Sequence, residues 1–219
     1  MSDFIIYNGV QSFDNKKEKN TDFLLTENEL MSQMFAVHKS NKNIAVLDHA
    51  DYKQAASHYL LGAQGVEETL CAHSNLYDIL TNEMGDYFKY NRKHLNKGLY
   101  EDRGFYIKDV EFSYQEQKAK FNVIGATAPN NAMQFKKFTQ EENEKALFSR
   151  IDFILSVAAL NNVDILIVGP FGCSVYGQKI EKVVTIFKEL LTNKYAKVFE
   201  RVYFNTNKHN LYLRALKLF

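Results

Sequence analysis

Tryptophan is absent from this chain of 219 residues, and proline and cysteine occur only twice each. Two cysteines, Cys71 and Cys173, are too few for a disulfide framework or a cysteine zinc site, so we expect a reducing, cytoplasmic setting with no metal and no cofactor. The first residues lack the basic and apolar blocks of a signal peptide. No apolar run approaches the length of a membrane span, and we expect no membrane partner.

An excess of charge of either sign is also missing. The chain has 27 Lys and Arg residues against 26 Asp and Glu residues, a formal net charge of +1. Such a balance gives no electrostatic pull toward nucleic acid or an anionic membrane, so a phosphate-bearing ligand would have to be held by local geometry. The length suits one domain, and we find no internal repeat or linker, so we expect a single domain over residues 1–219.

Strand-like and helix-like segments alternate along the chain, which predicts an α/β fold with a mostly parallel sheet and helices on both faces. Thr26 with Glu29, and Thr139 with Glu142, fit the capping box that begins many helices. Residues 82–104 are polar and aromatic without a clear period, and we expect a surface loop or an insertion there. Strands are predicted at residues 4–7, 44–47, 105–112, 119–126, 164–168 and 202–204, and helices at 26–39, 66–80, 139–158 and 180–191.

A glycine-rich turn at residues 169–177 follows the most apolar predicted strand. Ligands of open α/β sheets bind at the carboxyl ends of strands, and glycines there let backbone N–H groups approach a phosphate. No Gly-Lys-Ser/Thr follows, so the turn is not a P-loop, and its glycines are not spaced as in a dinucleotide fingerprint. The pattern alone leaves phosphate binding and a purely structural turn equally open.

The segment ILIVGPFGCSVYGQ at residues 165–178 resembles the phosphate-binding loop of the microbial-type poly(ADP-ribose) glycohydrolases, which are macrodomains and whose loop usually runs GAWGCGVFG. Together with the motifs named next, the resemblance covers most of the chain from Ile44 onward, in the family's order. It implies a macrodomain-like three-layer α/β/α sandwich with a mixed, mostly parallel sheet. The other matching segments are residues 46–77 (strand, catalytic loop and Gln-Glu-Glu signature), 98–103 (GLYEDR for GLYTDR), 127–130 (TAPN for AAPN) and 199–202.

The resemblance implies an ADP-ribose cleft with two walls. Glu67 and Glu68 match the two glutamates of the signature, and Glu68 falls on the catalytic one, which protonates the leaving oxygen at the anomeric carbon and then activates water. Burial and the like charge of Glu67 would help such an acid to keep its proton. Without the resemblance, the helix dipole would explain two acids in a first helical turn. The implied ligand-binding residues are Asp48, Gly62, Ala63, Thr127, Pro129, Asn130, Gly169, Phe171, Gly172, Cys173, Ser174, Val175 and Tyr176, with Phe171 and Tyr176 against ribose or adenine.

The sequence departs from the family pattern mainly on the catalytic wall. The family's Asn-Pro-Gly-Gly-Gly falls on residues 54–58, which here read QAASH, and Asp48-His49 replaces the usual Asn-Phe. The leading prediction is an ADP-ribosyl glycohydrolase-like hydrolase that acts on an ADP-ribosylated protein, polymer or nucleic acid. The alternative is a macrodomain that binds ADP-ribose or a related NAD-derived nucleotide without cleaving it. A third interpretation makes Cys173 a nucleophile at a strand-to-helix elbow, although the flanking glycines are wrongly spaced for it.

Overall fold

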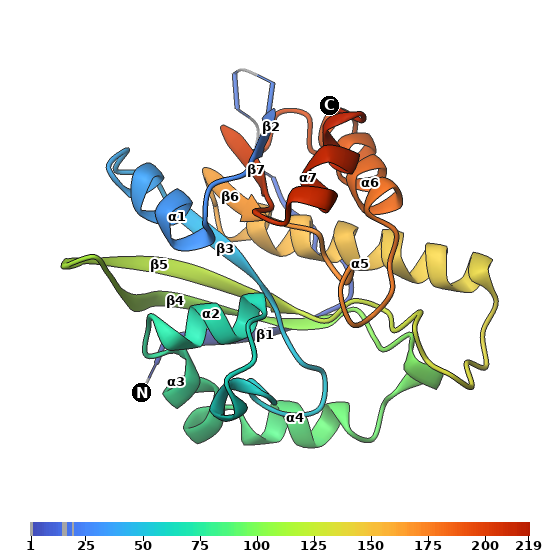
Figure 1. Ribbon diagram of the computed structural model, residues 1–219. Helices are drawn as coiled ribbons and strands as arrows, with labels where there is room; N and C mark the ends of the chain where they lie inside the picture. The colour runs from blue at the N-terminus through green and yellow to red at the C-terminus, as the bar shows by residue number, and fades with distance from the viewer. Residues whose placement is uncertain (1, 15–16, 19) are drawn as a thin grey trace.

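The computed structural model describes residues 2–14, 17–18 and 20–219, and within them the strands form one seven-stranded sheet (Figure 1). The strand order is β1-β4-β5-β3-β6-β7-β2. From β5 to β2 all neighbours are parallel, whereas β4 pairs antiparallel with both β1 and β5. The mixed, mostly parallel sheet is therefore confirmed. The strands are β1 (Phe4–Asn8), β2 (Asp22–Thr26), β3 (Ile44–His49), β4 (Arg103–Tyr114), β5 (Gln117–Ala126), β6 (Ile165–Val168) and β7 (Arg201–Asn205).

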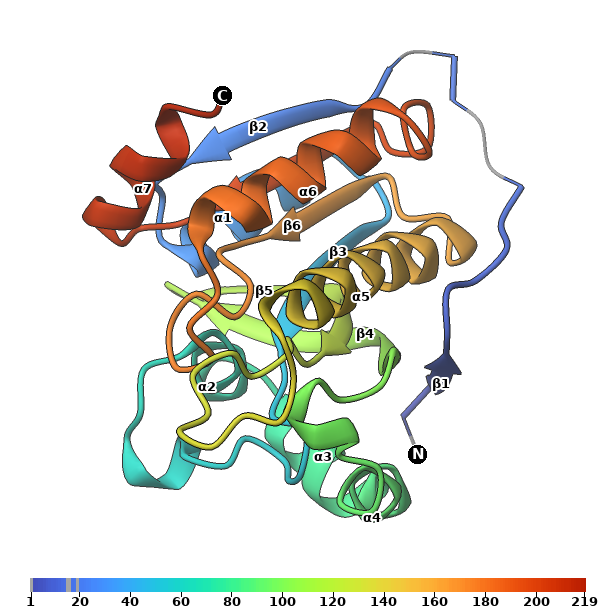
Figure 2. The same ribbon diagram turned by 90° about the vertical axis from the view of Figure 1, so that its right-hand side faces the viewer.

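Helices cover both faces of the sheet, which confirms the three-layer sandwich (Figure 2). Side chains of α5, α6 and α7 belong to the core on one face, and those of α1, α2, α3 and α4 to the core on the other. None of the helices in the described ranges is both long and apolar enough to cross a bilayer. The helices are α1 (Leu30–His38), α2 (Val66–Ala72), α3 (Leu76–Glu83), α4 (Gly85–Asn91), α5 (Gln140–Leu160), α6 (Ile180–Thr192) and α7 (His209–Leu216), with 3-10 turns at Tyr59–Leu61 and Asn96–Gly98.

The alternation of side chains along β3 determines on which face of the sheet its last two residues, Asp48 and His49, lie. Leu47 belongs to the core beneath α5 and α6, whereas Val46 belongs to the core beneath α1 to α4. Because successive side chains of a strand point to opposite faces, Asp48 lies on the α2 side of the sheet and His49 on the other. His49 indeed meets the ring of Phe171, which is part of the α5 and α6 core.

The predicted amino-terminal helix boundary is wrong, whereas the later one is confirmed. Thr26 does not cap a helix, because it is the last residue of β2 and pairs with Asn205 of β7. Helix α1 begins only at Leu30, and its preceding residue, Glu29, makes no side-chain capping bond. At α5, by contrast, Thr139 and Glu142 form the complete capping box that the sequence predicts.

Two further segments differ from the prediction. The expected loop at residues 82–104 contains helix α4, whose Tyr87 is buried against Phe105 of β4 with ring centroids 5.5 Å apart. The single helix expected at residues 66–80 is two helices, α2 and α3, because Ser74 leaves the helical path and bridges to β4. In both segments, contacts with strand β4 determine the secondary structure. Such long-range contacts leave no periodic pattern in the local sequence.

Candidate active site

A cleft of about 910 Å³ lies at the carboxyl edge of the parallel strands. Parallel strands end at the same edge of a sheet, so the topology itself brings five separate chain segments together there. The volume is that of a small-molecule site. The segments are residues 29–31 after β2, 49 and 51 at the end of β3, 128 and 130 after β5, 169–172 and 174–176 after β6, and 205–208 at the end of β7.

The turn after β6 forms one wall of the cleft and is built to receive an anion. Gly172 has φ +72°, and a Cβ there would lie 2.5 Å from the Cβ of Ala128. The amide of Cys173 donates to the carbonyl of Pro170 at 3.0 Å, so this predicted ligand donor is used inside the turn. Clustered free amides form a nest that attracts a phosphate. Within the described residues, the turn amides without a hydrogen-bond acceptor are those of Gly169, Gly172, Ser174, Val175 and Tyr176.

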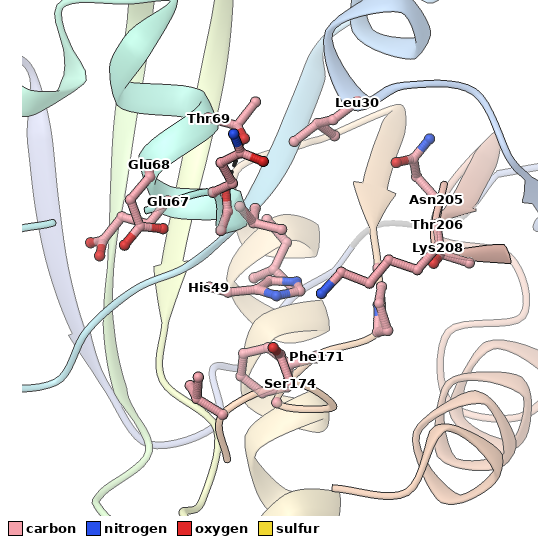
Figure 3. A pocket seen from close by; sticks show the side chains of 18 of the residues that line it. Leu30, His49, Glu67, Glu68, Thr69, Phe171, Ser174, Asn205, Thr206 and Lys208 are labelled. Atoms are coloured by element: carbon pink, nitrogen blue, oxygen red, sulfur yellow. Dashed lines mark hydrogen bonds between the residues drawn. The ribbon is translucent and has the colours of Figure 1, made fainter. Parts of the chain in front are cut away.

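The first turn of α2 forms the opposite wall. Glu67 and Glu68 both line the cleft, and Figure 3 shows both side chains leaving α2 on the same side. Glu67 is buried, its Oε2 accepts the N–H of Asp51 at 3.2 Å, and its Oε1 has no hydrogen-bond partner among the residues that the structure describes. The half-buried Glu68 lies over Gly65, where any Cβ would collide with its carboxylate. The two predicted acids therefore differ in environment, with Glu68 the more accessible.

Asp48 lies behind these glutamates, below the cleft surface instead of on it. Its side chain has no exposed surface, and neither carboxyl oxygen has a hydrogen-bond partner in the described residues. Burial, followed by the negative charge of Glu68, raises the pKa of Asp48 well above its ordinary value. Burial, followed by the charge of Asp48, does the same to the pKa of Glu67. The direct ligand contact expected for Asp48 is therefore not available in this structure.

We expect Asp48→Asn to stabilise the protein at alkaline pH. Because both pKa values are raised on folding, the folded protein keeps protons that the unfolded chain releases, and stability falls as the pH rises above the ordinary carboxyl range. The amide removes one buried carboxylate, so the variant should gain about 1–3 kcal/mol in free energy of unfolding at about pH 8 and little at about pH 4. Urea unfolding at both pH values measures the difference. An equal change at the two values would contradict it.

An aromatic and basic group lies on the phosphate-loop side of the cleft. Phe171 is fully buried and meets His49 edge-on, with ring centroids 5.4 Å apart, so its ring supports the floor and presents no free face to a ligand. Burial, followed by the charge of Lys208, lowers the pKa of His49 to about 4, which leaves this histidine neutral at neutral pH. Figure 3 shows the Lys208 side chain directed toward His49. Tyr176 is only half-buried and lines the cleft.

Lys208 is a functional candidate that the sequence interpretation missed. It lines the cleft and follows β7 by three residues. Its position just beyond the carboxyl end of a parallel strand was the available signal, because segments at that edge face ligands.

The remaining predicted residues divide between the cleft and the layer behind it. Thr127 is buried, and its Oγ1 donates to the carbonyl of Ala50 at 2.8 Å. Burial raises the pKa of the Cys173 thiol to about 12, which opposes a nucleophilic role. No group of three or more His, Cys, Asp or Glu side chains in the described part of the chain is arranged to hold a metal ion. Ala63, Asn130, Gly169, Ser174 and Val175 line the cleft, whereas Gly62, Thr127, Pro129 and Cys173 do not.

The segment at residues 54–58, aligned above with the family's catalytic loop, contains one residue with a left-handed backbone. Ala56 has φ +39°, in the left-handed region that favours glycine, and it is buried. The next two residues, Ser57 and His58, line the cleft. Beside the glutamates, the cleft is therefore lined by serine and histidine at positions where the family pattern has glycine.

Arg150 of α5 fixes the turn that follows β5, and the sequence interpretation did not single it out. Its guanidinium is fully buried and pairs with Asp102 at 2.8 Å. The same group donates to the carbonyl of Leu99 at 3.3 Å and to that of Thr127. It therefore joins the 98–103 and 127–130 segments, which both resemble family motifs.

This arrangement defines an α/β/α domain with a cleft that has a glycine-rich turn with free amides on one wall and two glutamates on the other. The sequence of residues 3–115, more than half of the 219, matches the family described as microbial-type PARG, catalytic domain, where PARG is poly(ADP-ribose) glycohydrolase. The chain belongs to this family.

Solved structures of bacterial relatives have the same fold. Poly(ADP-ribose) glycohydrolase from Thermomonospora curvata is 21% identical over 97% of this chain and 85% of its own, with a TM-score of 0.85. The enzyme from Deinococcus radiodurans in complex with ADP-ribose is 25% identical over 93% of this chain and 87% of its own, with a TM-score of 0.83. The Thermomonospora curvata enzyme bound to the inhibitor ADP-HPD is 22% identical over 91% of this chain and 79% of its own, with a TM-score of 0.84. No curated protein matches the sequence.

Proposed function

We propose that this chain binds ADP-ribose in the cleft and hydrolyses an ADP-ribosyl glycosidic bond. The observation that carries the proposal is the pairing of two walls in one cleft: free amides at residues 172 and 174–176, and the carboxyl groups of Glu67 and Glu68. The amides suit the diphosphate, and Lys208 adds a positive charge on the same side. With the diphosphate at the amides, the distal ribose would lie beside the carboxyl groups of Glu67 and Glu68. The complexes of bacterial relatives with ADP-ribose and with ADP-HPD support the same ligand class.

In the proposed reaction Glu68 acts as acid and then as base. Its carboxyl group donates a proton to the leaving oxygen as the bond from that oxygen to the anomeric carbon breaks. The resulting carboxylate takes a proton from water, whose oxygen bonds to the oxocarbenium-like anomeric carbon. Water is consumed, the leaving group departs with its hydroxyl, and Glu68 ends in the protonation state in which it began. Glu68 suits this role because it is the more accessible acid of the pair.

The substrate class follows from the ligand. We propose an ADP-ribosylated protein or polymer, with nucleic acid only as an ADP-ribosylated substrate, because the net charge of +1 offers no general attraction to it. Both cysteines are free, which suits a reducing compartment, and we propose the cytoplasm.

A binding module without catalysis is the second candidate, and the altered segment at residues 54–58 favours it. Ser57 and His58, which stand where the family has glycines, line the cleft together with the glutamates, so a distal ribose would have to fit beside their side chains. In that case the phosphate nest would still capture ADP-ribose, while the leaving group would not reach Glu68.

Calorimetry with ADP-ribose and an assay for released ADP-ribose, on the same preparation, test the proposal. Binding together with turnover of an ADP-ribosylated substrate is the expected result. Binding without turnover of protein, polymer and nucleic-acid conjugates would establish the second candidate. Absence of binding would contradict both.

We expect Gly172→Ala to weaken ADP-ribose binding. The added Cβ would meet Ala128, and a left-handed residue with a side chain costs about 1–2 kcal/mol, so the turn should relax and its amides move apart. The loss should be about tenfold or more in Kd by calorimetry. Gly177→Ala is the matched control, because Gly177 is also left-handed, at φ +65°, but lies outside the cleft lining. Equal losses in the two variants would show that strain alone, and not the nest, causes the effect.

A further inference from the structure

Asp48 is a buried carboxyl group for which the proposed reaction has no use, and it stands where the family usually has an asparagine. It has no exposed surface, and neither of its oxygens has a hydrogen-bond partner in the described part of the chain. Strand alternation in β3 directs it toward α2, whose Glu67 is also buried and has an unpartnered Oε1. Two unsatisfied carboxyl groups thus share one apolar layer directly behind the cleft wall.

Within the described ranges, no cation pairs with these groups. From α2 the titratable groups acting on them are Glu67, Glu68 and Cys71, and from the loop after β3 the group is Asp51. All carry either negative charge or none. Neither Asp48 nor Glu67 forms a salt bridge within the described residues. Two carboxyl groups buried in the same apolar layer, with no salt-bridge partner among the described residues, cannot both stay ionised at neutral pH.

We propose that Asp48 is a positioning residue that holds one proton jointly with Glu67 and so sets the charge beside the catalytic acid. This inference rests on the proposed function for its consequence in catalysis, but the shared proton itself is a property of the free protein. With one proton retained, the pair carries a single negative charge next to the anomeric carbon. That charge favours an oxocarbenium-like centre. At higher pH the pair acquires a second negative charge. This charge repels the negative charge that Glu68 gains when it gives its proton to the leaving oxygen, so the reaction should slow.

Carbon-13 NMR of side-chain carboxyl groups, across a pH titration of the free protein, tests the shared proton directly. In the wild type we expect two coupled steps, the later one well above the range of exposed carboxyl groups. Asp48→Asn and Glu67→Gln should each leave one step, close to the earlier one of the wild type. If Glu67 in Asp48→Asn still titrates at the later wild-type midpoint, the two groups are independent and the inference is wrong. Asp86→Asn removes an exposed acid of α4 and should change neither step.

The pH profile of hydrolysis separates positioning from mere support of the fold. The wild type should lose activity across its later titration step, and Asp48→Asn should keep its activity through the same pH range. A uniform drop in kcat at every pH, with an unchanged profile, would assign Asp48 a purely structural role. If no substrate is turned over, the proposed function fails, while the NMR titration still decides whether the proton is shared.

Discussion

Glu68→Gln is expected to reduce hydrolysis of an ADP-ribosylated substrate by about 10²–10⁴-fold, because an amide can neither protonate the leaving oxygen nor activate water. The glutamine has nearly the same shape, and it can keep the position over Gly65 that the carboxylate occupies. ADP-ribose affinity should therefore change little, since the diphosphate is held by the turn after β6 on the other wall. The loss should appear in kcat, measured by release of ADP-ribose under saturating substrate.

Glu141→Gln is the matched control for this variant. Glu141 also occupies the first turn of a helix, α5, but it is exposed and lies outside the cleft lining. Each substitution removes a negative charge that interacts favourably with a helix dipole. A change in stability from this cause should therefore appear in both variants. Unchanged turnover in Glu68→Gln would remove Glu68 from the mechanism, and a large loss in Glu67→Gln alone would move the acid/base role to Glu67.

The parts of the fold that the sequence predicts well are those with strong local patterns. The strand β6 is apolar throughout and lies between two covered faces, and α6 carries an apolar stripe, so the turn between them was located correctly. The complete capping box at Thr139 likewise marks the start of α5. The strand β2 was missed because it is a five-residue edge strand whose pairing with β7 involves residues almost 180 positions away.

The candidate site was predicted less completely, because its chemistry depends on contacts between distant segments. Family motifs pointed to Glu67, Glu68 and the turn after β6, and the structure brings all three to one cleft. The sequence around Asp48 gives no indication that α2 covers this side chain, or that its carboxyl group is buried without a hydrogen-bond partner among the described residues. Phe171 was expected against the ligand, but its ring is fully buried against His49.

Arg150 did have a signal in the sequence. It lies three residues after Leu147 and four before Ile154, so it falls within the apolar stripe of α5, where a charged residue requires a buried partner. The partner, Asp102, could not be identified from spacing, since 48 residues separate the two. Only the folded chain brings them together.

Arg150→Met should be strongly destabilising for this reason. The thioether fills part of the space but leaves Asp102 without its cation and the carbonyls of Leu99 and Thr127 without a donor. Removing one partner of a buried ion pair costs about 3–5 kcal/mol, and we expect the lower end because Asp102 retains some contact with water. At roughly 2–4 °C per kcal/mol for a domain of this size, Tm should fall by about 10 °C.

The matched control is Arg214→Met, which breaks the pair between Arg214 and Glu181. That pair is doubly hydrogen-bonded, at 2.8 and 2.7 Å, but both side chains are about half exposed, so its loss should cost at most about 1 kcal/mol. Differential scanning calorimetry of both variants gives the comparison.

Because Arg150 also anchors the turn at residues 127–130 beside the cleft, the surviving folded fraction of Arg150→Met should bind ADP-ribose more weakly, whereas Arg214→Met should bind it normally. Similar Tm values for the two variants would mean that burial of the Arg150 pair contributes nothing special to the fold.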